Sequence, residues 1–307
     1  MVNRRRGAGA EMIVLVTGGS GFIGRHIVAR LSLSHEVLAP SHADLDLTDG
    51  DAVKRWLAGK SIDAVVHAAV KPGHRNAPDA TSLTDQNLRQ FFAILRCRDA
   101  FGRLVVVSSG AVYGAQRPVA GVREEDLGHV LPPDEHGFSK YVEALELQHD
   151  GDAVELRPFG VFGPGEDYAI RFISNACCKA LLGLPITLRR DRLFSYVWVE
   201  DLATVVEAAL HDKRSGGLAA GAYNVTPPAP VRLRELADMV VAVSADKVPV
   251  KVAQAGMGSD YFGDAGKLHA ALPDSTPTTM VEGVRRLYDW YAQHHGQIDR
   301  AVLLRDR

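Results

Sequence analysis

The chain has 307 residues, of which 46% are hydrophobic and 23% are charged, so it can bury a full core in one large domain or two unequal lobes. Its formal net charge of -2 excludes a global basic field for nucleic acid or an anionic membrane. The apolar run near the N-terminus is too short for a signal peptide or a membrane span. The positions of Cys97, Cys177 and Cys178 indicate neither a disulfide framework nor a metal site. We therefore expect a cytoplasmic protein without a bound metal, with a flexible leader over residues 1–10.

The first predicted element is a strand that ends at glycine. Residues 12–16 form an unbroken apolar run rich in β-branched residues, which is typical of a strand buried on both faces of a parallel sheet. Gly18, Gly21 and Gly24 follow at a three-residue spacing, and apolar positions then recur at helical period up to residue 31. Dinucleotide binding requires this order of strand, glycine turn and helix, because backbone N–H groups at the helix start must approach a pyrophosphate.

The string Thr-Gly-Gly-Ser-Gly-Phe-Ile-Gly, residues 17–24, resembles the signature of the extended short-chain dehydrogenase/reductase family (NAD-dependent epimerase/dehydratase type). Members of this family mostly modify nucleotide sugars, and the resemblance spans nearly all of residues 12–292. It implies a nicotinamide dinucleotide cofactor that contacts Gly18, Gly21, Phe22, Ile23 and Gly24.

Alternating strand and helix patterns through residue 157 predict an α/β fold, with a doubly wound parallel (Rossmann) sheet and right-handed crossovers. The resemblance adds a smaller, discontinuous substrate-binding lobe. We expect residues 11–165 to form the dinucleotide-binding domain, with residues 192–225 returning to it. Residues 166–191 and 226–307 are expected to form the substrate-binding lobe.

The end of the second predicted strand, residues 36–39, bears on the choice between NAD and NADP. An NAD site usually has an acid here for the adenosine ribose, but the chain continues Pro40-Ser41-His42. The missing carboxylate removes repulsion toward a 2′-phosphate, which Ser41, His42 or Arg25 could face. Asp44 could instead supply the acid from the loop. NADP is therefore slightly favoured over NAD.

The resemblance implies further cofactor contacts along the chain. Asp46 and Leu47 match the segment beside the adenine, although Thr48 or Asp49 could equally cap the next helix. Ala68 and Ala69 follow a third buried strand, residues 62–66, where the family forms a wall of the cofactor pocket. Asn87, in a helix predicted over residues 79–100, matches an asparagine whose amide supports the active site.

The predicted catalytic group contains one departure from the family. Ser109 follows the fourth strand, residues 104–107, and aligns with the Ser/Thr that hydrogen-bonds the reacting sugar oxygen. The expected Tyr-x-x-x-Lys is His136-Gly137-Phe138-Ser139-Lys140, and the resemblance implies that Lys140 holds the nicotinamide ribose. Histidine can do acid/base work near neutral pH, but Lys140 and an oxidised nicotinamide disfavour its cationic form. Three interpretations of His136 are open: an altered acid/base residue, inert packing in a weakened site, or an engineered replacement of the tyrosine. Tyr113 is another possible proton donor.

The residues after Ser109 narrow the range of reactions that the family resemblance allows. Family dehydratases carry Asp-Glu there, where this chain has Gly110-Ala111, and relatives that epimerise beside a ketone carry a Cys at the position of Ala111. What remains is hydride transfer at one carbinol carbon. The favoured function is reduction of a 4-keto (deoxy)sugar nucleotide. The alternatives are a nucleotide-sugar 4-epimerase and a catalytically impaired dinucleotide sensor.

The substrate lobe carries one candidate anion contact. Arg192 lies two residues before the aromatic of a predicted strand, where the family binds the diphosphate of its nucleotide sugar, and Arg bonds oxyanions bidentately. Gly160 stands where the family more often has Asn. The resemblance also implies a homodimer, formed through the helices of residues 79–100 and 136–148.

Overall fold

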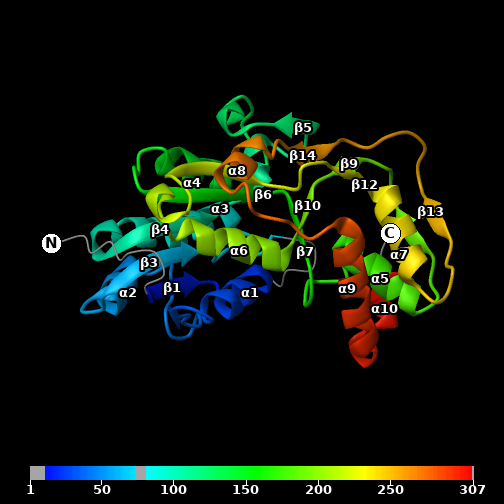
Figure 1. Cartoon of the computed structure of the whole chain (residues 1–307), viewed down its shortest axis with the longest axis horizontal. Coiled ribbons are helices and arrows are strands. Elements are labelled where there is room, and N and C mark those ends of the chain that lie inside the picture. Colours follow the sequence, from blue (N-terminus) through cyan, green and yellow to red (C-terminus); the bar gives the residue numbers. More distant parts are fainter. Residues whose placement is uncertain (1–10, 74–80, 306–307) are drawn as a thin grey trace.

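The computed structural model describes residues 11–73 and 81–305, so the predicted leader lies outside the described residues. Within those ranges the main body is a six-stranded parallel sheet in the order β11-β6-β4-β3-β1-β2 (Figure 1). The strands are β1 Ile13–Thr17, β2 Glu36–Leu38, β3 Ile62–His67, β4 Phe101–Val107, β6 Ala153–Pro158 and β11 Gly221–Val225.

Helices cover both faces of this sheet. On one face α1 (Phe22–Leu31) packs against α6 (Val199–Ala209), and on the other α2 (Gly50–Leu57), α3 (Leu83–Leu95) and α4 (Glu135–Leu147) pack side by side. Successive side chains of a strand point to opposite faces. Val14 accordingly joins the core beneath α1, while Leu15 joins the core beneath α2 and α3. Burial on both faces explains the unbroken apolar run of the first strand.

The chain order of the strands places a switch point between β1 and β3. From β1 the chain crosses to β2 on one side, and from β3 onward the strands are added on the other side. The register pairs Thr17 with His67. Crossover connections diverge at such a point, which leaves a crevice outside the carboxyl ends of the two strands.

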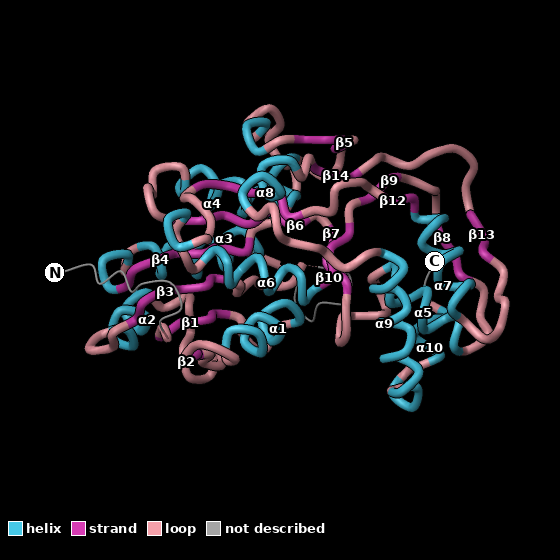
Figure 2. The backbone as a smooth tube through the Cα atoms, in the orientation of Figure 1, coloured by secondary structure: helices cyan, strands magenta, loops and turns pink. Residues whose placement is uncertain are grey.

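A second body packs around a core of its own at the opposite end of the molecule (Figure 2). It contains α5 (Phe172–Leu181), α7 (Leu233–Val243), α9 (Met280–Gln293) and α10 (Arg300–Leu304). A parallel pair, β8 (Ile186–Leu188) and β13 (Val250–Val252), lies at its edge. Cys177 and Cys178 are free thiols buried in this core.

Short strands connect the two bodies. β7 (Gly160–Phe162) pairs with β10 (Tyr196–Trp198). In the described chain a four-stranded sheet has the order β12-β9-β14-β5, with β5 Val119–Val122, β9 Leu193–Phe194, β12 Val231–Arg232 and β14 Tyr261–Gly263. After β13 the chain returns over the main sheet, where α8 (Gly266–Ala271) packs on β11 (Figure 1). This part of residues 226–307, which we assigned to the lobe, thus lies against the dinucleotide-binding body.

The structure shortens some predicted elements. The helix predicted over 79–100 is α3, which ends at Leu95, and residues 79–80 lie outside the described residues. Short 3₁₀ turns cover Arg98–Ala100 (η1), Glu124–Asp126 (η3), Lys213–Ser215 (η4) and His295–Gln297 (η5). Among the helices of residues 11–73 and 81–305, none combines the length and apolar character needed to cross a membrane.

Candidate active site

The turn after β1 presents backbone to the crevice. Gly18 has a φ of 72°, and a Cβ there would lie 2.7 Å from the Cα of Ala69, so only glycine fits between the two strand ends. A Cβ at Gly24 would lie 2.0 Å from the carbonyl oxygen of Gly18. No described side chain caps the start of α1 at Gly21. The first N–H groups of α1 and the positive end of its dipole are therefore available to an anion.

A cleft of about 530 Å³ opens at this turn, a volume typical of small-molecule and cofactor sites. Eight of the predicted cofactor contacts line it: Gly18, Gly21, Phe22, Ile23, Gly24, Leu47, Ala68 and Ala69. The turn with Gly18, Gly21 and Gly24, which we call the glycine cradle, the uncapped start of α1 and the volume of the cleft together fit a dinucleotide.

The opposite wall of the cleft was missed by the sequence analysis. Glu166, Asp167, Ile170 and Arg171 line it from the segment that precedes α5. The preceding turn is bonded to α1, because the Arg25 guanidinium donates to the carbonyl oxygen of Gly165 over 2.7 Å. The only local signal was the acidic pair that directly follows the Gly-Pro-Gly turn.

Glu166 is a buried carboxyl in this wall. It is 6% exposed, and the Ser174 hydroxyl donates to its Oε2 over 2.6 Å. Burial raises the pKa of Glu166 to about 8, although the Ser174 bond and the Arg171 charge oppose the rise. Glu166 is therefore mostly protonated at neutral pH, which keeps one negative charge out of a cleft that suits an anion.

Residues 40–47 form the end of the cleft where we predicted the adenosine contacts. Pro40, His42, Leu45 and Leu47 line this end, whereas the predicted contact Ser41 does not. The Ser41 hydroxyl donates to Asp44 over 2.6 Å, so the loop acid that we considered lies beside the cleft rather than in its lining. Arg25, bonded to Gly165, is likewise absent from the lining.

Asp46 and Asn87 also have structural partners. Asp46 accepts from the Thr48 N–H over 2.8 Å, while Asp49 is the residue that caps α2. Asn87 is buried, and its Oδ1 accepts from the Lys71 N–H over 2.7 Å. Neither side chain lines the cleft, so their cofactor roles stay predictions.

Ser109 lies at the carboxyl end of β4 and caps the short turn η2 (Gly110–Tyr113). Its Oγ accepts from the Ala111 N–H over 3.1 Å. The next residue, Gly110, packs against the ring of Phe159, because a Cβ at Gly110 would lie 2.7 Å from that ring. The Phe159 ring lies 5.1 Å from the ring of Tyr261, so β14 packs beside η2.

His136 lies in the first turn of α4, which Asp134 caps by accepting from the Gly137 N–H over 2.9 Å. Burial and then the charge of Lys140 lower the pKa of His136 to about 4; Asp134 opposes this and Arg171 adds to it. The imidazole is therefore neutral at pH 7, in line with our expectation. Arg171 lines the cleft, and its positive charge also lowers the pKa of His136. His136 therefore lies within electrostatic range of a residue of the cleft.

Lys140 is buried with a partner one turn along α4. Its Nζ donates to Glu143 Oε2 over 2.8 Å, and the two side chains are 3% and 1% exposed. Burial and then the Lys140 charge lower the pKa of His67, and the same charge lowers that of His136. An ammonium has three N–H donors, so the bond to Glu143 leaves capacity for the predicted ribose contact.

Tyr113, the other donor that we considered, is held in a buried network. Its hydroxyl donates to Asn224 Oδ1 over 2.8 Å and accepts from Arg157 Nη1 over 2.8 Å. Arg157 in turn donates to Glu155 over 2.6 Å. This network holds η2, β6 and β11 together, so Tyr113 is explained by packing rather than by acid/base work.

Arg192 lies half-buried at the start of β9. Its guanidinium lies 4.9 Å from the ring centroid of Phe194 and donates to the Ser259 carbonyl over 3.5 Å. None of the described carboxylates pairs with this guanidinium. Because Ser259 precedes β14 by two residues, this bond holds Arg192 beside the start of that strand.

The structure accounts for glycine at position 160. A Cβ there would lie 2.7 Å from atoms of both Phe194 and Tyr196. These two rings stack with centroids 4.5 Å apart. Aromatic side chains thus fill the space into which the family's asparagine would project.

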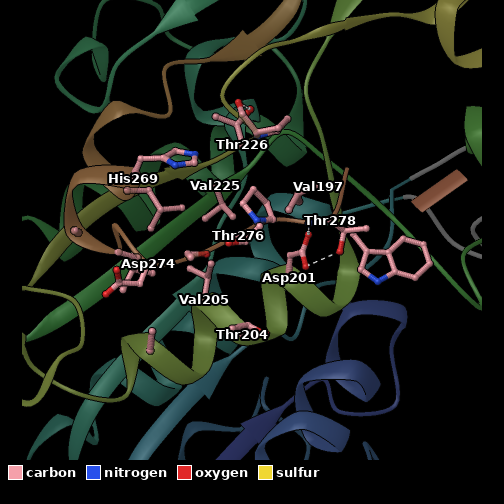
Figure 3. Close-up of a pocket in the computed structure, with 18 of the residues that line it drawn as sticks. Val197, Asp201, Thr204, Val205, Val225, Thr226, His269, Asp274, Thr276 and Thr278 are labelled. Atoms are coloured by element: carbon pink, nitrogen blue, oxygen red, sulfur yellow. Dashed lines mark hydrogen bonds between the residues drawn. The ribbon is translucent and has the colours of Figure 1, made fainter. Parts of the chain in front are cut away.

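A second cavity, of about 470 Å³, lies between α6, β11 and residues 268–278. Figure 3 shows Thr278 and Asp201 at its wall, where the Thr278 N–H donates to Asp201 over 2.8 Å. None of the predicted site residues lines this cavity, so it is separate from the candidate cofactor cleft.

A model of the NAD dependent epimerase/dehydratase family matches residues 14–226. The chain belongs to this family. A dTDP-4-dehydro-6-deoxy-D-allose reductase from a Streptomyces species is 30% identical to this chain over an alignment of 325 positions, which covers 93% of this chain and 98% of the relative.

Solved structures share the fold of this family member. A GDP-L-fucose synthetase from Naegleria fowleri, bound to NADP, superposes with a TM-score of 0.76 at 15% identity, over 94% of this chain and 96% of that one. A UDP-glucose 4-epimerase from Thermus thermophilus, in complex with NAD, superposes with a TM-score of 0.74 at 26% identity, over 94% and 100%. The predicted family and the predicted Rossmann fold class are thus confirmed.

Proposed function

We propose that this family member is an NADPH-dependent reductase of 4-keto (deoxy)sugar nucleotides. Two features at the carboxyl-terminal edge of the sheet support the proposal. The glycine cradle and its cleft fit a dinucleotide. Ser109, His136 and Lys140 lie on η2 and α4, which pack together at the end of β4, although none of the three lines the cleft. The Streptomyces relative is named as a reductase of a dTDP-4-dehydro-6-deoxy sugar.

The chain's own residues would prepare the ketone for reduction. The turn at Gly18, Gly21 and Gly24 would hold a nicotinamide dinucleotide, which would supply the hydride for the C4 carbon. Ser109 donates a hydrogen bond to the C4 oxygen and polarises the carbonyl. Lys140 holds the ribose and makes the surrounding potential positive, and Arg192 bonds the diphosphate. Gly110 and Ala111 carry no acid or base that could eliminate water.

The coenzyme would be NADPH. The residues of segment 40–47 that line the cleft include no carboxylate that would repel a 2′-phosphate, and they include the imidazole of His42. The test is the dissociation constant for NADPH and for NADH, measured by calorimetry on the purified protein. Tighter binding of NADH would contradict this part of the proposal.

The reductase test incubates the protein with NADPH and a panel of 4-keto-6-deoxy sugar nucleotides. We expect oxidation of NADPH with at least one acceptor. Arg192→Met should raise KM about 10- to 100-fold, because charge-assisted hydrogen bonds to a diphosphate are lost. Arg190→Met, at an exposed neighbouring arginine, is the matched control. Tight binding of coenzyme without turnover of any acceptor would favour the sensor.

A 4-epimerase is the second candidate, because a neutral His136 can accept the proton that oxidation of a carbinol releases. Incubation with NAD and UDP- or dTDP-hexoses, followed by analysis of the sugar at C4, separates the two. Epimerised product without net change of the coenzyme would establish the epimerase.

We further propose a cytoplasmic homodimer built on α3 and α4. The two helices pack together, and Leu145 of α4 is 37% exposed. Light scattering should give twice the mass of the chain, and Leu145→Glu should lower it. A monomeric wild-type protein would overturn the dimer. Fractionation of cells that express the protein tests the location.

A further inference from the structure

Among the described residues that line the cofactor cleft, Arg171 is the one arginine or lysine. It directly precedes α5, and its side chain is exposed. None of the described carboxylates pairs with its guanidinium. A guanidinium offers five N–H donors in a planar fork, so it can bind an oxyanion bidentately. Arg171 is therefore available to an anion that enters the cleft.

The wall that carries Arg171 is bonded to the start of α1. The Arg25 guanidinium donates to the carbonyl oxygen of Gly165 over 2.7 Å. The Nε2 atom of His26 lies 3.0 Å from the carbonyl oxygen of Pro164, at hydrogen-bond distance. Both bonds come from the first turns of the helix whose N–H groups face the cleft. They hold the wall, and Arg171 with it, across the cleft from the glycine cradle.

The carboxyls of this wall leave much of the Arg171 charge uncancelled. Glu166, with a pKa of about 8, is mostly protonated at neutral pH. Asp167 also lines the cleft, but its side chain is exposed and its Oδ1 accepts from the Ala169 N–H over 2.9 Å. Water screens an exposed carboxylate strongly. The wall therefore presents a positive charge to the glycine cradle, of which Asp167 offsets only a part.

The position of the wall selects one anion of the coenzyme. In a glycine turn the pyrophosphate lies at the helix start, and the wall is bonded to that part of α1. The adenosine end lies at residues 40–47, where His42 lines the cleft. The positive end of a helix dipole amounts to about half an elementary charge, so α1 alone leaves most of the pyrophosphate charge unmatched. Arg171 is placed to supply the rest.

We propose that Arg171 binds the coenzyme pyrophosphate from the side opposite the glycine cradle, so that the coenzyme bridges the two bodies of the protein. This inference rests on the coenzyme part of the proposed function and not on the reaction. The glycine cradle and α1 belong to the body of the main sheet, whereas Arg171 precedes α5, which packs in the core of the second body. Coenzyme binding should therefore order the start of α5.

Calorimetry with two coenzymes tests the contact. Arg171→Met should raise the dissociation constants of NADPH and NADH by the same factor, about 10- to 100-fold, because both carry the pyrophosphate. Arg171→Lys keeps the charge but loses the planar fork, so its loss should be smaller. Arg214→Met, at an exposed arginine outside the cleft lining, is the matched control and should bind as the wild type does. Unchanged affinities in Arg171→Met, or a loss confined to NADPH, would overturn the proposal.

Hydrogen exchange, followed by NMR, tests the bridge in the wild-type protein. The Asn175 N–H donates to the Arg171 carbonyl oxygen over 2.8 Å, so its exchange reports on the order of residue 171. Saturating NADPH should slow this exchange in the wild type and slow it less in Arg171→Met. The amides of α7, in the same body but outside the cleft lining, are the internal reference and should not change.

The two failures can be told apart because neither measurement needs an acceptor sugar. An Asn175 exchange rate that NADPH leaves unchanged in the wild type would overturn the bridge, even if the protein reduces a ketone. A protein that shows both effects but turns over no acceptor would establish the Arg171 contact and refute only the reductase.

Discussion

Replacing Glu166 by glutamine should change how the stability of this protein depends on pH. The Glu166 carboxyl has an ordinary pKa of 4.5, and burial in the cleft wall raises it to about 8. The folded state therefore holds a proton that the unfolded state releases across this interval. Stability from this group is fully present below pH 4.5 and is lost as the pH rises through 8.

The size of the effect follows from the width of that interval. Each pH unit inside it costs the wild-type protein up to about 1.4 kcal/mol of unfolding free energy, so the full loss is roughly 5 kcal/mol. Glutamine has no proton to lose, and its amide oxygen can still accept from Ser174. The unfolding free energy of Glu166→Gln relative to the wild type should therefore increase steadily as the pH rises.

The assay is urea unfolding of both proteins at about pH 5, 6, 7 and 8, followed by tryptophan fluorescence. The difference in unfolding free energy should be near its smallest at pH 5 and grow toward pH 8. Asp167→Asn, at the exposed neighbouring residue, controls for the loss of one formal charge. If the Glu166→Gln and wild-type curves run parallel over this range, the carboxyl is not held protonated and the reasoning about the cleft wall is wrong.

Three further changes test the site. Gly24→Ala should abolish NADPH binding in calorimetry or unfold the chain, because its Cβ would lie 2.0 Å from a carbonyl oxygen; normal binding would refute the close approach. Asp44→Asn removes a charge beside the adenosine end of the cleft and should tighten NADPH more than NADH, whereas equal changes would place Asp44 away from the 2′-position. His136→Tyr should raise kcat, since a phenol carries at neutral pH the proton that the neutral imidazole lacks; an unchanged or lower kcat in steady-state assays would count against this.

The sequence by itself determined the cofactor half of the protein. The apolar run, the glycine spacing and the helix that follows are contiguous, so the forces that shape them act over a few residues. The structure has them as β1, the turn at Gly18 and α1. The Asp49 cap of α2 was one of two local alternatives, and it is the one that forms.

Only the tertiary structure decided which side chains complete the site. Glu166 becomes a buried acid because the segment that precedes α5 forms a wall of the cleft. Tyr113 carries a phenol that could give a proton, yet Arg157 and Asn224 engage its hydroxyl. The residue type determines whether a side chain carries a proton that it could donate. Burial and hydrogen-bond partners, which come from distant parts of the chain, decide whether that proton is available.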